Sequence, residues 1–292
     1  MTAIAYTACA LIWGTTWFAI RQCLQAYPPF LAIALRLSLA AALLMLGAFV
    51  LVPRPRWPGR SLFGLLAAGV FNATSFGCIY QAERTITGGL AAVLFGTMPL
   101  MTAALGAIAK TERLQWRSLP GALAALCGVM LIYSDAMGAA RASGVLLALV
   151  AVLTSSIFTI IVKQSAANVH PVASSGLFLS SSAMMTWIFA IVAGQTTLPS
   201  PLAVGPSVAI LYLALVGSVI VFLFYFTLLK RVSAFTSTTI VFIEPVIALA
   251  IDHVWEAQPL ARMAYVGIAL TLAGVALTLW LGSERSKGAS TS

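Results

Sequence analysis

The sequence predicts an all-α integral membrane protein with ten transmembrane helices, arranged as two inverted five-helix repeats. The 292-residue chain is 61% hydrophobic and only 8% charged, whereas a soluble domain carries about 25% charged residues. Its mean hydropathy is +1.02. Ten apolar stretches follow one another along the chain, each near the roughly 20 residues that cross a bilayer core. The connections between them are too short to hold a soluble domain.

The ten helices are expected where the sequence remains apolar for a full bilayer thickness. The first stretch lacks a charged N-terminal region and a clear small-residue cleavage site, so we expect a retained helix rather than a signal peptide. The fifth and tenth stretches carry Gly and Ala at four-residue spacing, which favours close helix packing and a scaffold role. The expected spans are 3–22, 30–52, 61–80, 88–109, 117–133, 143–163, 172–194, 206–229, 235–252 and 263–282.

The basic residues predict the orientation of the chain. Its net charge is +9, but Lys and Arg are scattered over short loops without interleaved aromatics, so nucleic acid is not an expected partner. With the N-terminus inside, 11 basic residues fall in cytoplasmic segments and 4 on the opposite side. Because basic residues stay on the cytoplasmic side during insertion, both termini are expected in the cytoplasm.

The sequence gives no support for an enzyme, a metal site or a cofactor. It contains no GxxxxGK phosphate loop and no GxSxG nucleophile motif, and its two Asp residues lie far apart. The four cysteines form no CxxC pair and lie in or beside apolar spans, which is typical of free thiols packed as small hydrophobes. We therefore expect no catalytic residue, no bound metal and no cofactor.

An internal repeat divides the chain into two halves. Residues 121–131 (GALAALCGVML) and 267–277 (GIALTLAGVAL) match at 5 of 11 positions with an offset of 146. The expected halves are 1–141 and 142–292, with five helices each. An odd number of helices inverts the second half relative to the first. Inverted repeats are typical of secondary transporters, in which two equivalent packings of the halves provide alternating access.

Three segments carry a resemblance to a known family. Residues 11–18 read LIWGTTWF, Arg36 lies in the sequence ALRL, and Glu244-Pro245-Val246 is followed by Trp255-Glu256. Together with the ten spans and the repeat, these motifs resemble the drug/metabolite transporter superfamily, EamA type, along essentially the whole chain. The first half departs from this pattern, because its matching stretch, Met98-Pro99-Leu100, has methionine before the proline.

The resemblance implies a multi-pass protein of the bacterial inner membrane that transports a small molecule. Within the family it is nearest to exporters of aromatic amino acids, so small amphipathic metabolites are the expected substrates. A lipid scramblase or flippase, or another metabolite carrier on the same fold, is the alternative. The lipid bilayer is the other expected partner, and the oligomeric state is left open with a monomer as the simplest expectation.

Aromatic and small polar side chains at mid-span predict a central cavity. Such a lining suits an amphipathic substrate with a flat ring, through stacking and cation–π contact. Plain helix packing and lipid contact are the alternative for each residue taken alone. The expected substrate-cavity residues are Trp13, Thr16, Trp17, Asn72, Phe76, Tyr80, Phe158, Phe222 and Tyr225.

Two charges and two prolines lie inside the spans. Glu244 is expected either to titrate or to face a substrate ammonium, or else to be a structural anion held by Arg36 or nearby hydroxyls. Arg36 is expected to snorkel to the headgroups or form an ion pair, with substrate binding as the alternative. Pro99 and Pro245 interrupt their helices and are interpreted either as paired hinges or as static kinks.

Overall fold

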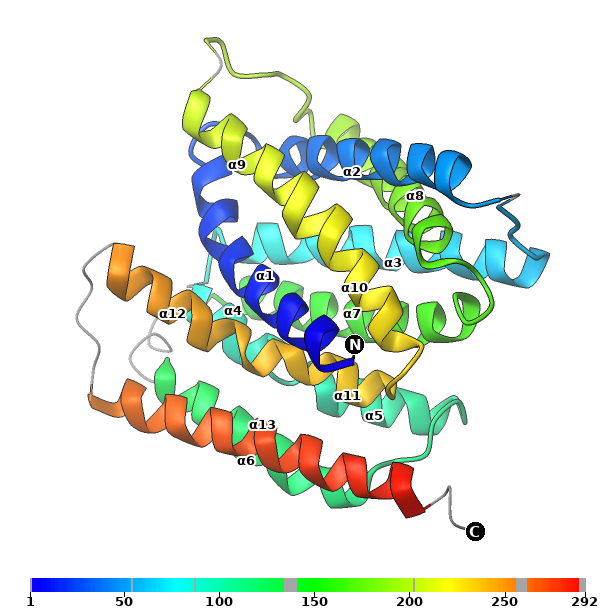
Figure 1. The fold of residues 1–292 in the computed structure, drawn as a ribbon. Helices are drawn as coiled ribbons and strands as arrows, with labels where there is room; N and C mark the ends of the chain where they lie inside the picture. Colours follow the sequence, from blue (N-terminus) through cyan, green and yellow to red (C-terminus); the bar gives the residue numbers. More distant parts are fainter. Residues whose placement is uncertain are drawn as a thin grey trace.

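The computed structural model describes residues 2–53, 55–86, 88–133, 141–201, 203–255 and 262–288, and within these ranges all regular secondary structure is helical (Figure 1). Nine helical segments in this described part are long and apolar enough to cross a membrane, and Trp116–Ile132 is a shorter apolar helix. The predicted fold class, an all-α membrane protein with two sets of five helices, is confirmed.

The observed helices follow the expected spans closely. Three spans are interrupted: the fourth is α4 and α5, the eighth is α9, a π-helical turn at Leu215–Ile220 and α10, and the ninth is α11, a 3₁₀ turn at Thr239–Phe242 and α12. The helices are α1 (Thr2–Cys23), α2 (Pro29–Leu51), α3 (Gly59–Ala82), α4 (Gly88–Phe95), α5 (Met98–Ile108), α6 (Leu119–Ile132), α7 (Ala142–Ser165), α8 (Pro171–Val192), α9 (Val204–Ala214), α10 (Val221–Leu229), α11 (Ala234–Thr238), α12 (Glu244–Trp255) and α13 (Arg262–Gly288).

The two prolines expected to interrupt helices both stand at the start of a new helix. Pro99 is the second residue of α5 and Pro245 the second residue of α12. Proline is tolerated there because the first backbone N–H groups of a helix have no intrahelical acceptor. At the first break, the Thr97 hydroxyl donates to the carbonyl of Leu94 at 2.6 Å. Each proline thus begins a helical segment rather than kinking a continuous helix.

The contacts between the two halves occur in equivalent pairs. Helix α3 of the first half packs on α7 of the second, and the equivalent contact with the halves exchanged is α1 on α9 and α10. In the same way α5 packs on α7, and α12 packs on α1. The pairs α2–α8 and α6–α13 each join equivalent helices of the two halves. The inverted repeat is therefore visible as a repeated set of helix–helix contacts.

Helices α6 and α13 run side by side at one edge of the bundle (Figure 1). Their backbones approach so closely that a Cβ on Gly128 would lie 2.5 Å from the backbone nitrogen of Thr271, and one on Gly121 2.6 Å from that of Thr278. The Thr271 hydroxyl donates across the interface to the carbonyl of Ala125, at 3.4 Å. The small residues of the repeat motif thus serve close packing away from the centre of the bundle.

Candidate functional site

A cavity lies at the centre of the bundle and is lined by helices of both halves. It encloses about 110 Å³, enough for several water molecules. Its lining includes all nine residues expected to form a substrate cavity, and also Arg36 and Glu244. Pro99 and Pro245 do not line the cavity, but each directly follows a residue that does, Met98 and Glu244 respectively. The lining also includes residues that sequence reasoning did not propose: Ile20, Ser75, Ile79, Glu83, Phe95, Met98, Ser237, Thr238 and Val241.

Helix α1 contributes one continuous wall of the cavity. Trp13, Thr16, Trp17 and Ile20 lie on one helical face because they are spaced three, four and seven residues apart. The Trp13 ring meets the ring of Tyr225 edge-on, with centroids 4.9 Å apart. The Thr16 hydroxyl donates to the Trp13 carbonyl at 2.7 Å within the helix, so Thr16 presents mainly its methyl group to its surroundings. This wall is therefore predominantly aromatic.

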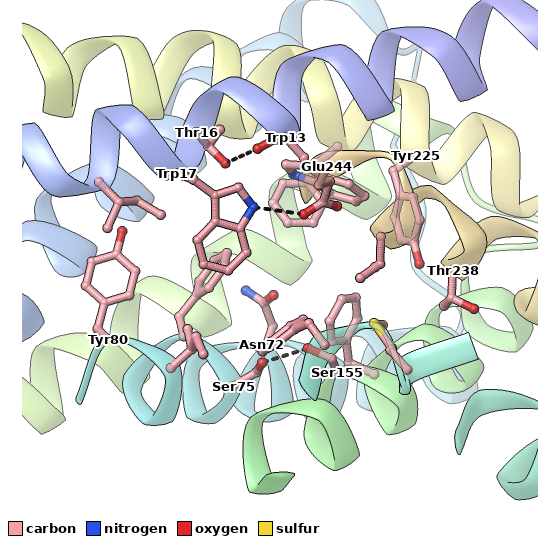
Figure 2. Close-up of a pocket in the computed structure, with 18 of the residues that line it drawn as sticks. Trp13, Thr16, Trp17, Asn72, Ser75, Tyr80, Ser155, Tyr225, Thr238 and Glu244 are labelled. Atoms are coloured by element: carbon pink, nitrogen blue, oxygen red, sulfur yellow. Dashed lines mark hydrogen bonds between the residues drawn. The ribbon is translucent and has the colours of Figure 1, made fainter. Parts of the chain in front are cut away.

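Glu244 is the first residue of α12 and is only 7% exposed. Its Oε2 accepts a hydrogen bond from the indole Nε1 of Trp17 at 3.2 Å (Figure 2). A carboxylate at the start of a helix is stabilised by the helix dipole. No ion pair joins Glu244 to Arg36 among the described side chains, so the interpretation that Arg36 holds this anion is wrong. The break before α12 supplies the favourable helix end instead.

Arg36 is 2% exposed and lies among protein groups rather than at the headgroups. Its Nε donates to the hydroxyl of Ser218 at 2.9 Å and its Nη2 to the carbonyl of Gly217 at 2.6 Å. Its guanidinium carbon lies 5.0 Å from the centroid of the Phe76 ring, within cation–π range. The snorkelling interpretation is therefore wrong. The groups that accept its hydrogen bonds belong to the π turn between α9 and α10. No sequence motif predicted this turn.

The wall opposite α1 combines polar side chains with aromatic ones. The Asn72 amide donates to the Ser182 hydroxyl at 3.1 Å, and the hydroxyls of Ser75 and Ser155 are 2.6 Å apart. In Figure 2, Asn72, Ser75 and Ser155 lie across the cavity from Trp17 and Glu244. A molecule in the cavity would thus have indole rings and a carboxylate on one side, and hydroxyl and amide groups among further aromatic rings on the other.

The two ends of the cavity differ. We call the end at which α1 begins the inner end and the end at which α1 stops the outer end. Towards the inner end the rings of Phe178, Phe222 and Phe226 pack together, with centroids 5.2 Å apart for Phe178 and Phe222 and 5.4 Å apart for Phe178 and Phe226. All three rings are at most 1% exposed, so they fill this end.

The outer end of the cavity carries a second carboxylate. Glu83 follows the last residue of α3 and lines the cavity. Burial raises its pKa to about 7, although the nearby charge of Arg21 acts in the opposite direction. Sequence reasoning missed Glu83 because a charge at the end of a span is usually a solvated loop residue. Its position relative to the cavity depends on how α3 packs against α1.

No group of three or more His, Cys, Asp or Glu side chains that could hold a metal ion occurs in the described part of the chain. The four cysteines are free. Glu256, which belongs to one of the sequence motifs, lies outside the described residues. The geometry of the site is therefore that of a binding cavity built from rings, hydroxyls and isolated charges.

Comparisons with known proteins identify the family. The model of the EamA-like transporter family matches twice, at residues 1–134 and 142–280. Protein PagO of Salmonella typhimurium strain LT2 is 27% identical, over 95% of this chain and 92% of its own. The inner membrane transporter YedA of Escherichia coli strain K12 is 28% identical, over 94% and 89%.

Two further matches concern an exporter and a solved structure. A probable terminal-alkyne amino-acid exporter of Streptantibioticus cattleyicolor is 26% identical, over 91% of this chain and 89% of its own. A solved crystal structure superposes with a TM-score of 0.79 over 97% of this chain and 98% of that one, at 20% identity, and shows the same fold. The chain is a membrane transporter and not an enzyme, and it belongs to the EamA-like transporter family.

Proposed function

We propose that this transporter exports small amphipathic molecules that carry a flat ring and an amino group, aromatic amino acids foremost. The observation that carries the proposal is the central cavity, which combines indole and phenyl rings with one buried carboxylate and one buried guanidinium. Because these two charges are not paired with each other, each is available to an opposite charge on a bound solute.

An aromatic amino acid matches this arrangement group by group. Its ammonium would face Glu244, whose only described hydrogen bond comes from the Trp17 indole. Its carboxylate would face Arg36, which has five N–H donors and uses two of its nitrogens for Ser218 and Gly217. Its ring would stack against Trp13 or Trp17, a contact worth about 1 kcal/mol. The two charges of the bound amino acid would exchange their hydrating water for these ionic partners, because a buried charge is costly unless it is paired.

Alternating access follows from the repeat. The contacts between the two halves occur in equivalent pairs, so exchanging the two packings would close one end and open the other. The breaks before Pro99 and Pro245 lie at equivalent places in the fourth and ninth spans, and we propose that both act as hinges. With the inner end filled by rings, this conformation faces outward.

The direction of transport rests on the orientation of the chain. The distribution of Lys and Arg predicts that the inner end and both termini lie in the cytoplasm. YedA, a relative, is named an inner membrane transporter, and another relative is named a probable amino-acid exporter. We accordingly propose export across the bacterial inner membrane, by a protein that needs no cofactor.

Counterflow in liposomes tests the proposal. Purified protein is reconstituted into vesicles loaded with unlabelled phenylalanine, tyrosine or tryptophan, and uptake of the labelled amino acid is followed. We expect transient accumulation with these solutes and with aromatic amines, and little with alanine or glutamate. A parallel assay follows the flipping of fluorescent phospholipids in the same vesicles. Flipping without counterflow would refute the proposal in favour of a lipid scramblase.

A further inference from the structure

Two charged side chains join the halves of the protein at the inner end. Glu112 lies in the connection between α5 and α6, and both its oxygens are 2.9 Å from the backbone nitrogen of Ala234, the first residue of α11. Lys163 lies near the end of α7. Its Nζ is 3.6 Å from Glu112 Oε1 and donates to the carbonyl of Leu229, the last residue of α10, at 2.8 Å.

We infer that Glu112 and Lys163 form a latch that holds the inner end of the cavity closed and that must open in each transport cycle. The inference rests on the alternating-access part of the proposed function. The two side chains bind both ends of the connection between α10 and α11: Glu112 binds Ala234, and Lys163 binds Leu229. Lys163 also donates to the carbonyl of Val232 within the connection. Glu112 belongs to the first half, whereas the connection between α10 and α11 belongs to the second.

The segments held by the latch line the cavity. Helix α10 carries Phe222 and Tyr225, and α11 carries Ser237 and Thr238, all part of the cavity lining. Movement of α10 and α11 away from the first half would open the inner end, and the contacts of Glu112 with Ala234 and Lys163 would have to break first.

The charges of the latch suit the groups that they bind. A carboxylate accepts the N–H of Ala234, and an ammonium donates to two backbone carbonyls and to the carboxylate, so every contact is charge-assisted. The side chains of Lys163 and Glu112 are 27% and 19% exposed, so the pair is screened less than a fully exposed one. Exchanging the two charges would keep an ion pair but set an ammonium against a backbone N–H and a carboxylate against carbonyls.

Labelling of a cavity cysteine tests the latch. Ser155 lies in the cavity wall and is 5% exposed. Ser155→Cys is made in a chain whose four native cysteines are replaced, and a membrane-impermeant maleimide is added to oriented vesicles from the inner or the outer side. We expect E112Q and K163M to raise inner-side labelling about tenfold, equivalent to about 1.4 kcal/mol, and to lower outer-side labelling. The neighbouring change R113Q, a charge with no described contact, is the control and should leave both rates unchanged.

Two further outcomes decide between a latch and simpler explanations. The exchanged pair E112K/K163E should label from the inner side at least as fast as E112Q, since neither side chain then suits its backbone partners; rescue to the parent rate would refute the arrangement inferred here. Labelling that rises from both sides together would indicate loss of fold and would also refute the latch. Unchanged labelling in both single variants would show a static contact. Because labelling needs no substrate, failure of the counterflow assay leaves this test intact.

Discussion

The inner and outer ends of the cavity are built from different kinds of side chain. The inner end is filled by Phe178, Phe222 and Phe226 and is held beneath by charge-assisted contacts between Glu112, Lys163 and the backbone. The outer end carries one carboxylate, Glu83, at the end of α3. The closed end thus consists of groups that satisfy one another, whereas the outer end carries a carboxylate that faces the cavity, with the charge of Arg21 nearby. Inverted repeats supply similar backbones at both ends, and the side chains make them different.

Removing a ring from the closed end should have the largest effect. Phe178 is 0% exposed and packs against three other rings, those of Phe158, Phe222 and Phe226. Phe178→Ala should destabilise the fold by about 2 kcal/mol, below the roughly 3–5 kcal/mol of a soluble core, because lipid solvates the ring once the helices separate. Thermal unfolding in detergent measures the loss.

The matched change is Phe63→Ala, which removes a ring that is 73% exposed on α3. It should shift the unfolding temperature very little. If both variants lose the same stability, the packing of rings is not what holds the inner end closed.

A wall residue nearer the outer end should have a smaller effect, confined to binding. Trp17 contacts the Phe95 ring edge-on, with centroids 6.3 Å apart, and donates to Glu244. Trp17→Ala should weaken binding of aromatic solutes several-fold, or about 1 kcal/mol, as measured by the concentration dependence of counterflow. Trp17→Phe keeps a ring but not the N–H and should fall between the parent and Trp17→Ala. Equal loss in both variants would assign the effect to the hydrogen bond rather than to stacking.

The contrast between the ends also explains what the sequence could predict. The spacing of Trp13 and Trp17 along one helix placed them on a common face, and the repeat placed Pro99 and Pro245 at equivalent interruptions, because both patterns are local or periodic. The partners of Arg36 could not be predicted, since they depend on a π turn whose sequence, LVGSVI, resembles any apolar helix. The contact of Glu112 with Ala234 joins positions that only the packing of the two halves brings together.

The smallest expected effect concerns pH at the outer end. Glu83 has a folded-state pKa of about 7 against an ordinary value of 4.5, chiefly because of burial. For an acid with a raised pKa, folding is favoured most below pH 4.5 and loses this contribution as pH rises through 7, since the folded state then carries a poorly solvated charge. The charged or titratable groups that interact with it are Arg21, Cys23 and Tyr80.

Glu83→Gln removes the charge that appears as pH rises. The variant should therefore gain about 2 °C in unfolding temperature over the parent at pH 8 and nothing at pH 4, where the parent carboxyl is protonated in both states. Glu112→Gln provides the comparison at the other end, where the carboxylate accepts an N–H and lies beside an ammonium, and the same change should lower stability at pH 8. A gain at pH 8 for both variants, or for neither, would show that the carboxylates of the two ends do not differ as the structure indicates. The opposite signs expected of two Glu→Gln changes in one protein follow from their surroundings alone, since one charge has backbone and ammonium partners and the other loses more through burial than the charge of Arg21 returns.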